Sequence, residues 1–349
     1  MLDTPAYASM TAKTPLVPYM IERREPRPHD VLIDILYCGI CHSDIHQARN
    51  EWGNSHFPVV PGHEIVGTVL KAGEHVTKWR VGDTVGVGCF IDSCRKCKAC
   101  LDGEEQFCEE GMSLTFNGFE RDGITPTYGG YSTQITVNED YVLRIPHGMD
   151  LKRVAPLLCA GITTYSPLKR FIKARDSVAI LGLGGLGHMG VKIAKAMGAK
   201  VTVLSHSPNK RADALALGAD DFIATKDTNV FKENSKRFDF LLDTISFQHD
   251  YNAYLELLKR DKTMVLVGLP DPVPLSAGPL IMQRRHLSGS LIGGIRETQE
   301  MLDFCADNKV LSDVEVIPIQ KVNEAYERVL KSDVRYRFVI DLASFKKNR

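Results

Sequence analysis

The sequence predicts a two-domain α/β protein, in which a β-rich domain comes first and a doubly wound parallel sheet follows. Three observations support this prediction. The chain has 349 residues, more than a single hydrophobic core usually serves. Up to Ile145, short extended stretches alternate with turns that contain Gly and Pro. From Ser177 onward, short apolar strands alternate with helical patterns, which is typical of βαβ units.

Composition narrows the class of protein. Hydrophobic residues make up 44% and charged residues 25% of the chain, as in ordinary globular domains. The 43 Lys and Arg residues balance 43 Asp and Glu residues, which disfavours a function based on binding nucleic acid or an anionic membrane. The sequence has no apolar run long enough to span a membrane and does not begin with a secretion-signal pattern. We therefore expect a cytoplasmic protein that acts on a small molecule.

The expected elements follow from these patterns. Strands are predicted at 31–37, 65–71, 83–88, 131–138 and 141–145, and a helix at 151–158. The alternating part is predicted to contain strand 177–181, helix 186–197, strand 201–204, helix 211–217, strand 238–243, helix 251–258 and strand 264–269. After Gly294, helices at 298–307 and 323–330 and strands at 314–319 and 337–340 can join either domain.

Four cysteines with short spacing predict a metal site. Cys94, Cys97, Cys100 and Cys108 supply four thiolates, which is the donor set of a closed tetrahedral zinc site. Because four protein ligands leave no position for substrate, we expect a structural role. Such a site also suits a zinc ribbon that binds nucleic acid, but the zero net charge and the Gly-rich segment described below disfavour that alternative.

A second group of metal-binding residue types is more dispersed. Cys41, His63 and Cys159 form the pattern of one His and two Cys that a catalytic zinc uses when its fourth position is open. Their separation along the chain leaves ordinary core packing as an equal alternative. The remaining cysteines, Cys38, Cys89 and Cys305, are predicted to be buried thiols, although Cys89 can line the site from the end of its strand.

The segment Gly182-Leu-Gly-Gly-Leu-Gly187 predicts a dinucleotide-binding turn. It follows an apolar strand and opens a helix, which is the context that the motif requires. Free N–H groups at the start of that helix suit phosphates. After the next strand, where NAD enzymes carry an acid, the chain has Ser205 and, further on, Lys210 and Arg211. Hydroxyls and cations favour a 2′-phosphate, so we expect NADP(H), with solvent-facing cations as the alternative.

Together these motifs resemble those of a known family. The spacing Gly62-His63-Glu64-x2-Gly67-x5-Gly73-x2-Val76, the four cysteines and the Gly-rich turn occur in the order seen in zinc-dependent medium-chain dehydrogenases. The chain is most similar to the cinnamyl alcohol dehydrogenase-like group, which contains NADP-dependent alcohol dehydrogenases and aldehyde reductases. The resemblance covers essentially the whole chain.

The resemblance implies a domain arrangement and an assembly. A GroES-like catalytic domain would contain residues 1–159 and 294–349, including a structural zinc lobe at about 89–112. A Rossmann NADP-binding domain would contain residues 160–293. The family's members commonly form dimers through their Rossmann sheets, so a homodimer with two zinc ions per chain, one catalytic and one structural, is expected.

The resemblance also implies residue roles. Cys41, His63 and Cys159 become ligands of the catalytic zinc, and Glu64 lies close enough to exchange with its water. Asp44 would orient His63, and Ser43 would pass a proton to His46. The expected coenzyme contacts are His42, Thr163, Gly182, Gly184, Gly185, Leu186, Gly187, Ser205, His206, Ser207, Lys210, Arg211, Val267, Ser290, Ile292 and Arg337. The expected substrate pocket contains Gln47, Trp52, Phe90, Leu114, Phe116 and Leu291.

These inferences predict an oxidoreductase that transfers hydride between NADP(H) and primary alcohols or aldehydes. An apolar and aromatic pocket favours a broad aldehyde reductase that also accepts aromatic and cinnamyl aldehydes. Trp52 and Asn54 lie in a loop where the plant enzymes of lignin synthesis usually differ, so cinnamaldehyde is not expected as the physiological substrate. The alternatives are an NAD-dependent polyol or secondary alcohol dehydrogenase, and a non-catalytic protein that binds zinc and NADPH.

Overall fold

The computed structural model describes residues 1–348, which form two compact units. The first contains Met1–Cys159, Gly293–Ala306 and the chain from Leu311 onward, and the second contains Ala160–Ile292 with Asp307–Val310. The turn Asp307–Val310 thus groups with the second unit, whereas the sequence analysis placed 294–349 entirely in the first. Within residues 1–348, no helix is both long and apolar enough to cross a membrane.

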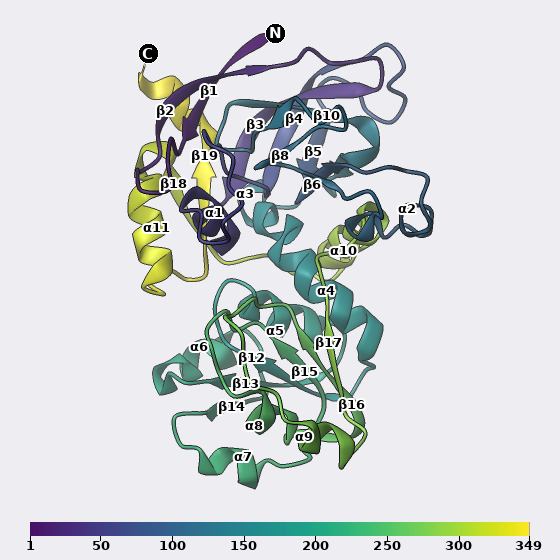
Figure 1. Cartoon of the computed structure of the whole chain (residues 1–349), viewed down its shortest axis with the longest axis vertical. Helices are drawn as coiled ribbons and strands as arrows, with labels where there is room; N and C mark the ends of the chain where they lie inside the picture. Colours follow the sequence, from purple (N-terminus) through teal and green to yellow (C-terminus); the bar gives the residue numbers. More distant parts are fainter. Residues whose placement is uncertain (349) are drawn as a thin grey trace. The chain divides into compact units, whose positions relative to one another are not determined.

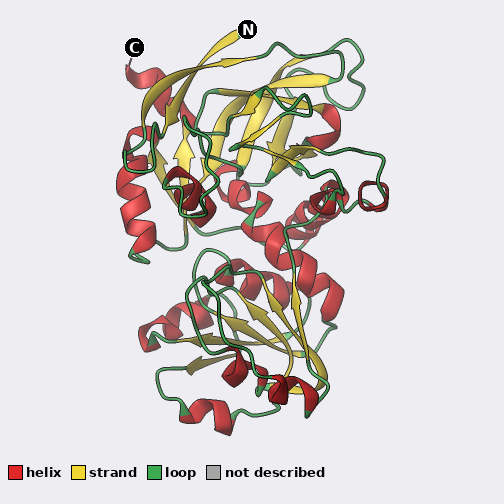
Figure 2. Cartoon of the chain, in the orientation of Figure 1, coloured by secondary structure: helices red, strands yellow, loops and turns green. Residues whose placement is uncertain are grey.

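A seven-stranded sheet organises the first unit (Figures 1 and 2). Its strands follow the order β11-β5-β4-β3-β19-β18, and β10 also pairs with β3. The late strand β19 pairs with β3 near the start of the chain, so the C-terminal segment completes this sheet. The strands are β3 (Asp30–Gly39), β4 (Ile65–Ala72), β5 (Thr84–Val87), β10 (Gln134–Asn138), β11 (Leu143–Arg144), β18 (Val314–Pro318) and β19 (Arg337–Asp341).

The central strand β3 explains why this sheet is stable. Its residues Val31–Ile33 are all buried, so the strand has the apolar character of a sheet interior. Gly67 of β4 is required beside it, because a Cβ atom there would lie 2.3 Å from the Asp34 carbonyl oxygen. The strands and the turns around them therefore place the ends of β3 and β4 close together, which positions the metal-binding groups described below.

Shorter elements surround this sheet. The remaining strands are β1 (Leu2–Ala8), β2 (Val17–Arg23), β6 (Phe90–Asp92), β7 (Ser113–Leu114), β8 (Gly118–Phe119) and β9 (Pro126–Thr127). The helices are α1 (His42–Ala48), α2 (Lys98–Asp102), α3 (Leu151–Val154), α10 (Ile295–Asp307) and α11 (Val322–Leu330), and a 3-10 turn at Ala155–Leu158 continues α3. That turn brings Cys159 to the first unit's boundary.

The second unit is the doubly wound parallel sheet that the sequence predicts, and the prediction is confirmed. Its strand order is β14-β13-β12-β15-β16-β17, and all five pairings are parallel. Counted along the chain, this is the order 3-2-1-4-5-6 of dinucleotide-binding sheets, with the change of direction between β12 and β15. The strands are β12 (Ser177–Leu181), β13 (Lys200–Ser205), β14 (Asp221–Ala224), β15 (Phe238–Asp243), β16 (Leu258–Leu266) and β17 (His286–Gly289).

Helices accompany this sheet in the expected alternation (Figure 2). They are α4 (Ala160–Phe171), α5 (Gly187–Ala196), α6 (Arg211–Ala216), α7 (Asn229–Glu233), α8 (Tyr251–Leu255) and α9 (Ala277–Ile281). Two predicted boundaries are wrong. The helix at 251–258 ends earlier, at Leu255, and β16 begins at Leu258 rather than at Met264. The register between β15 and β16 is irregular here, and a charged segment that ion-pairs with Asp239 hides the strand from a search for apolar runs.

A partly buried histidine fixes the segment that follows β15. His249 Nε2 lies 2.9 Å from Asp243 Oδ2, and Nδ1 lies 2.7 Å from the Phe247 carbonyl oxygen. Both partners are acceptors, and only the protonated ring can donate to both at once. The rings of Tyr251 and Tyr254 contact it edge-on. Burial lowers the pKa of His249, but Asp243, the Phe247 carbonyl and, at longer range, Asp250 outweigh it, and the net pKa is raised.

We predict that this cation makes stability depend on pH. Because the folded pKa lies above that of the unfolded chain, the contribution is complete at acidic pH and is lost as pH rises through the folded value. His249→Gln should therefore lower Tm by about 2–4 °C at pH 6, the effect of about 1 kcal/mol in a domain of this size. The difference should shrink at pH 9, because the folded protein loses this contribution as pH rises through the raised pKa. An equal difference in thermal scans at both pH values would contradict this assignment.

Candidate functional site

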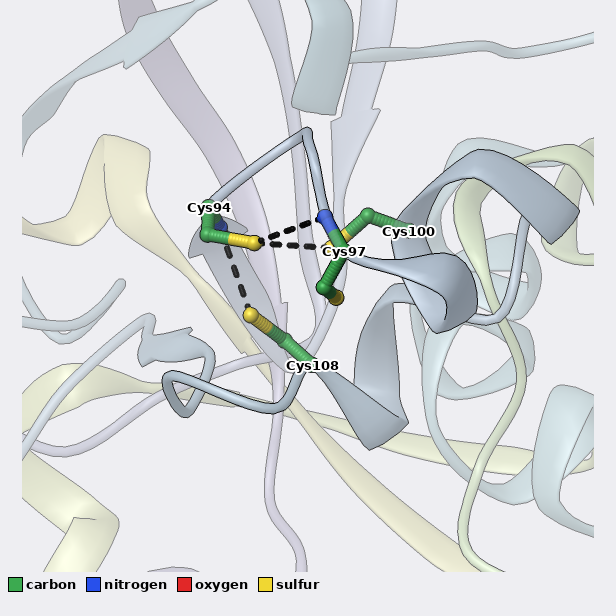
Figure 3. Close-up of side chains that lie close together, drawn as sticks. All are labelled: Cys94, Cys97, Cys100 and Cys108. Carbon is green, nitrogen blue, oxygen red and sulfur yellow. Dashed lines mark hydrogen bonds between the residues drawn. The ribbon is translucent and has the colours of Figure 1, made fainter.

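The four clustered cysteines converge in the loop that contains α2 (Figure 3). Their sulfur atoms all lie within 4.8 Å of one another, and Cys94 Sγ is 3.8 Å from Cys100 Sγ. In a tetrahedral site with bonds of about 2.3 Å, sulfur atoms are about 3.8 Å apart. Backbone N–H groups of Cys97 and Cys94 point at Cys94 Sγ and Cys108 Sγ, each at 3.3 Å. The donor set and its spacing therefore fit a zinc ion.

Few apolar contacts hold this loop. Leu101 and Phe107 are exposed, and the loop is joined to the sheet domain mainly by polar contacts. Ser93 Oγ lies 3.1 Å from Cys100 Sγ and 2.7 Å from the Tyr141 hydroxyl, and Arg95 lies over the Tyr141 ring. Because the loop has little core of its own, a metal crosslink would contribute most of its local stability.

The second group of donors is deeply buried. Cys41, His63, Glu64 and Cys159 bring their ligand atoms within 4.8 Å of one another, and Cys41 Sγ is 4.0 Å from Cys159 Sγ. Cys41 precedes α1, His63 precedes β4, and Cys159 follows the 3-10 turn after α3. The structure thus brings together three residues that are distant in the sequence. Two thiolates and an imidazole are the donors of a catalytic zinc site.

Asp44 holds this group together. Its carboxylate is fully buried and accepts hydrogen bonds from the backbone N–H groups of Cys41, at 2.8 Å, and Gly62, at 3.0 Å. It also lies 3.0 Å from His63 Nδ1, and the Tyr131 hydroxyl is 3.4 Å away. Because Nδ1 donates to Asp44, Nε2 of His63 keeps its lone pair for a metal ion. The predicted contact between Asp44 and His63 is therefore present.

Glu64 and Arg337 form a buried ion pair beside the donors. Burial acts to raise the pKa of Glu64, and the adjacent Arg337 guanidinium opposes this by stabilising the carboxylate. Among the described residues, Glu64 Oε2 is buried and has no hydrogen-bond partner. An unpartnered buried oxygen among metal donors fits a cation there. Arg337, expected at a coenzyme phosphate, has its guanidinium on this carboxylate and is 5% exposed.

Helix α1 carries the residues for which a role in proton transfer is predicted. Ser43 Oγ lies 3.7 Å from Cys41 Sγ, and one turn further on His46 Nδ1 contacts a carboxylate oxygen of Glu51. The indole of Trp52 stacks on the His46 ring at 4.9 Å, and the half-buried His42 ring lies 5.1 Å away. Sequence analysis missed Glu51. Its separation of five residues from His46 belongs to no motif, and only the turn after α1 brings the two side chains together.

The Gly-rich turn lies at the switch point of the second sheet. Gly182 has φ +89°, which favours glycine. Gly187 opens α5, and a Cβ atom there would lie 2.1 Å from the Gly182 carbonyl oxygen. At Gly184 a Cβ atom would meet nothing within 4 Å, so the backbone is open on that side. Tight packing at two positions and an open backbone between them suit a pyrophosphate at the helix start. Gly185 and Leu186 complete the turn.

Cations lie at the end of β13. The half-buried Lys210 donates from Nζ to the Leu183 carbonyl oxygen of the Gly-rich turn at 3.0 Å, and burial lowers its pKa. Ser205 ends the strand and accepts a hydrogen bond from the Ser207 N–H. His206 and Arg211 are exposed, and Arg211 donates to the Phe222 carbonyl oxygen. Ser205, Lys210 and Arg211 thus lie at or shortly after the end of the strand, and no Asp or Glu occupies positions 205–211.

The remaining predicted residues lie in both units. In the first unit, Phe116 is buried and stacks on His63 at 5.6 Å, while Phe90 is buried against Tyr141 and pairs with Leu114 in the sheet. Gln47 is buried on α1.

In the second unit, Thr163 lies buried in α4, Val267 follows β16, and Ser290, Leu291 and Ile292 follow β17. Cys89, expected in the core, is partly exposed and lies beside Cys159.

Comparisons with known proteins define the class. Residues 27–147 match the family model described as alcohol dehydrogenase GroES-like domain, and residues 185–307 match zinc-binding dehydrogenase. The chain belongs to the zinc-binding alcohol dehydrogenase family. The predicted family, the GroES-like fold of the first domain and the predicted enzyme class are thereby confirmed.

Individual relatives match over nearly the full chain. The NADP-dependent alcohol dehydrogenase C 1 of Mycolicibacterium smegmatis is 56% identical over 349 residues, covering 99% of this chain and all of the relative. The aldehyde reductase YahK of Escherichia coli is 52% identical, covering 96% and 97%. Among solved structures, the cinnamyl alcohol dehydrogenase SbCAD4 of Sorghum bicolor has a TM-score of 0.95 at 44% identity, with 98% of each chain covered. That of Helicobacter pylori, complexed with NADP(H), has a TM-score of 0.91 at 41% identity, with 98% of each chain covered.

We predict that the two donor groups bind metal independently. Purified wild-type protein should contain two zinc ions per chain. The Cys100→Ser variant should contain one ion, held at the buried site. Its Tm should be lower, because the loop loses its metal crosslink. Cys305→Ser alters a buried thiol outside both groups and should retain both ions. Elemental analysis measures the stoichiometry. Two ions in Cys100→Ser, or one in Cys305→Ser, would contradict the assignment.

Proposed function

We propose that this chain is a zinc-dependent alcohol dehydrogenase that uses NADP(H) and acts as a broad aldehyde reductase, including aromatic and cinnamyl aldehydes. The observation that carries the proposal is the convergence of Cys41, His63 and Cys159 beside Ser43 and His46. The names of the relatives, which include NADP-dependent alcohol dehydrogenases, an aldehyde reductase and cinnamyl alcohol dehydrogenases, support it.

The first unit would bind the metal and the reacting oxygen. Cys41, His63 and Cys159 would hold zinc, which when bound supplies a Lewis acid to the oxygen of the alcohol or aldehyde. Asp44 fixes the imidazole so that Nε2 faces the ligand atoms of the two cysteines. Glu64 gives a further carboxylate oxygen within reach of the same donors, and Arg337 balances its charge.

The proton of the reaction would travel along α1. The Ser43 hydroxyl can both donate and accept, so it can pass a proton between the substrate oxygen and the surroundings. His46 lies one turn further along the helix and is positioned by Glu51 and Trp52. A histidine with a carboxylate partner is suited to exchange that proton with solvent near neutral pH.

The second unit would bind the coenzyme. NADP(H), when bound, supplies or accepts the hydride at its nicotinamide. The open backbone at Gly184 and the N-terminus of α5 suit the pyrophosphate. Ser205, Lys210 and Arg211 would bind the 2′-phosphate, where a carboxylate would repel it. An NAD-dependent polyol dehydrogenase would be expected to carry an acid at this position.

We predict that Ser205→Asp reverses the coenzyme preference. The wild type should have a higher kcat/KM with NADPH than with NADH. In the variant, repulsion between like charges should lower the value for NADPH by about 100-fold relative to that for NADH. The control variant Ser235→Asp adds the same charge to an exposed loop before β15, and it should change neither the kcat/KM for NADPH nor that for NADH. A wild type that prefers NADH would contradict the proposed coenzyme.

We predict that Glu51 supports proton transfer. Glu51→Gln should lower kcat for aldehyde reduction by about 3- to 10-fold, a fraction of the usual contribution of a full acid–base group, because His46 remains in place. The KM for NADPH should stay the same. Glu74→Gln removes a carboxylate beside the exposed His75 and serves as the matched control. An unchanged kcat in Glu51→Gln would remove Glu51 from the proton path.

The homodimer and the cytoplasmic location also belong to the proposal. Strand β17 pairs only with β16 among the described strands, so its outer edge is unpaired in the monomer. Ile281, which ends α9, and Met282, which follows it, lie a few residues before β17 and are 72% and 76% exposed. An unpaired edge beside exposed apolar side chains favours association of two copies of this chain. Cell fractionation tests the location.

We predict that charges beside this edge prevent dimerisation. Wild-type protein should sediment as a dimer, and the double variant Ile281→Glu and Met282→Glu should sediment as a monomer, since burying the carboxylates costs more than the interface supplies. Leu101→Glu, at a position 71% exposed in the first unit, should remain dimeric. A monomeric wild type would contradict the predicted assembly.

The rival function is a zinc- and NADPH-binding protein without catalysis. The set of Ser43, His46 and Glu51 favours an enzyme, because a hydroxyl, an imidazole and the carboxylate beside that imidazole are groups that can relay a proton. Following NADPH oxidation with aliphatic, benzylic and cinnamyl aldehydes separates the two. Turnover that requires the buried zinc supports the enzyme, whereas protein with two zinc ions and bound NADPH but no turnover supports the rival.

A further inference from the structure

A chain of side-chain amides joins α1 to the segment that follows it. Asn117 lies just after β7, and its buried side chain reaches Gln47, 70 positions earlier, at the end of α1. The same side chain contacts the backbone of Asn54 and His56. Its neighbour Phe116 stacks on the candidate zinc ligand His63. The network therefore lies directly beside the proposed site but forms no part of the mechanism above.

The backbone fixes the orientation of the Asn117 amide. Its Oδ1 accepts a hydrogen bond from the His56 N–H at 2.8 Å, and its Nδ2 donates to the Asn54 carbonyl oxygen at 3.3 Å. A rotated amide would place two donors together at His56 and two acceptors together at Asn54. Because both backbone groups have a fixed polarity, only one orientation satisfies them. The second N–H of Nδ2 then points at Gln47.

This orientation in turn fixes Gln47. Asn117 Nδ2 donates to Gln47 Oε1 at 2.8 Å, and Ser55 Oγ lies 2.9 Å from the same oxygen. A rotated Gln47 amide would bring its Nε2 against the donor of Asn117. Gln47 must therefore present its NH2 group on its other side. That nitrogen has no hydrogen-bond partner among the described residues and is not sealed from solvent, so it can donate to a ligand.

Gln47 lies on the same face of α1 as Ser43 of the proposed proton path. Gln47 is four residues after Ser43 and one after His46, so Ser43 and Gln47 share a helix face. The Ser43 hydroxyl already lies near Cys41 Sγ. A substrate whose oxygen reaches Ser43 would extend along this face toward Gln47.

We propose that Asn117 is a positioning residue that sets the hydrogen-bond polarity of Gln47, so that the site favours aldehydes whose remote end carries a hydrogen-bond acceptor. The inference rests on the proposed aldehyde reductase function. It names a substrate class, aryl aldehydes with ether or carbonyl substituents, over equally large aldehydes with an alkyl substituent. Asn117 touches no reacting atom and acts only through Gln47.

The test compares kcat/KM for methoxybenzaldehydes and ethylbenzaldehydes, which are nearly isosteric, with the substituent at position 3 or 4. The measured quantity is the ratio of kcat/KM for the methoxy compound to kcat/KM for the ethyl compound. Comparing this ratio between variants cancels the intrinsic reactivity of each aldehyde. The wild type should prefer the methoxy compound. Asn117→Asp keeps the acceptor for His56 but faces Gln47 with a carboxylate, so the amide of Gln47 should rotate and present its oxygen instead. The methoxy-to-ethyl ratio should then fall about 3- to 10-fold, the effect of one hydrogen bond.

Two further variants make the result decisive. Gln47→Glu removes the donor directly, and it should lower the ratio in the same direction even if Asn117→Asp folds poorly. The Asn117→Asp variant itself should fold, because Asp tolerates the backbone φ of +58° found at this position. Asn138→Asp makes the same chemical change at a side chain whose oxygen caps a turn far along the chain, and it should leave the ratio unchanged.

The outcomes separate the inference from the function on which it rests. An active wild type with no methoxy preference, or an unchanged ratio in both Asn117→Asp and Gln47→Glu, would overturn the role of Asn117 and leave the aldehyde reductase intact. A general loss of kcat with an unchanged ratio would show a merely structural role. A wild type that reduces neither aldehyde would overturn the proposed function itself.

Discussion

The first unit depends on one buried carboxylate. Asp44 is fully buried and accepts from two backbone N–H groups and from His63. An ionised carboxylate is costly to bury unless such donors surround it. Satisfying it joins the start of α1, the turn at Gly62 and the imidazole in one arrangement. The same three bonds that stabilise the charge therefore also place Cys41 and His63 as neighbouring donors.

The other charges of the site follow from this arrangement. Two thiolates and two carboxylates would gather much negative charge in a buried volume, and cations must balance it. Arg337, on a strand from the end of the chain, supplies one positive charge through Glu64. A divalent ion at the donors would supply the rest. Because Arg337 is the first residue of β19, the return of the C-terminal segment to the first sheet also supplies the partner of Glu64.

Sequence reasoning succeeded where function depends on local spacing. The four cysteines and the segment from Gly182 to Gly187 each lie within one loop or turn, so their residue pattern already contains the geometry. The parallel sheet was also predictable, because four of its six strands are short apolar runs that alternate with helical patterns. Asn117 was not predictable, because only tertiary packing brings it to its partner Gln47. Glu51 was not predictable, because an irregular turn brings it to His46. Helix α4 and strand β14 lacked a clear apolar period and were also missed.

The central claim is that Asp44 assembles a metal centre on which hydride transfer depends. The most direct measurement is the zinc content and aldehyde reductase activity of Asp44→Asn at matched free zinc. The amide keeps the shape of the side chain but accepts fewer hydrogen bonds. We expect affinity for the buried zinc to fall about 10- to 100-fold, with activity falling in parallel and the ion of the four-cysteine loop retained. An Asp44→Asn protein that keeps both ions and full activity would contradict the account.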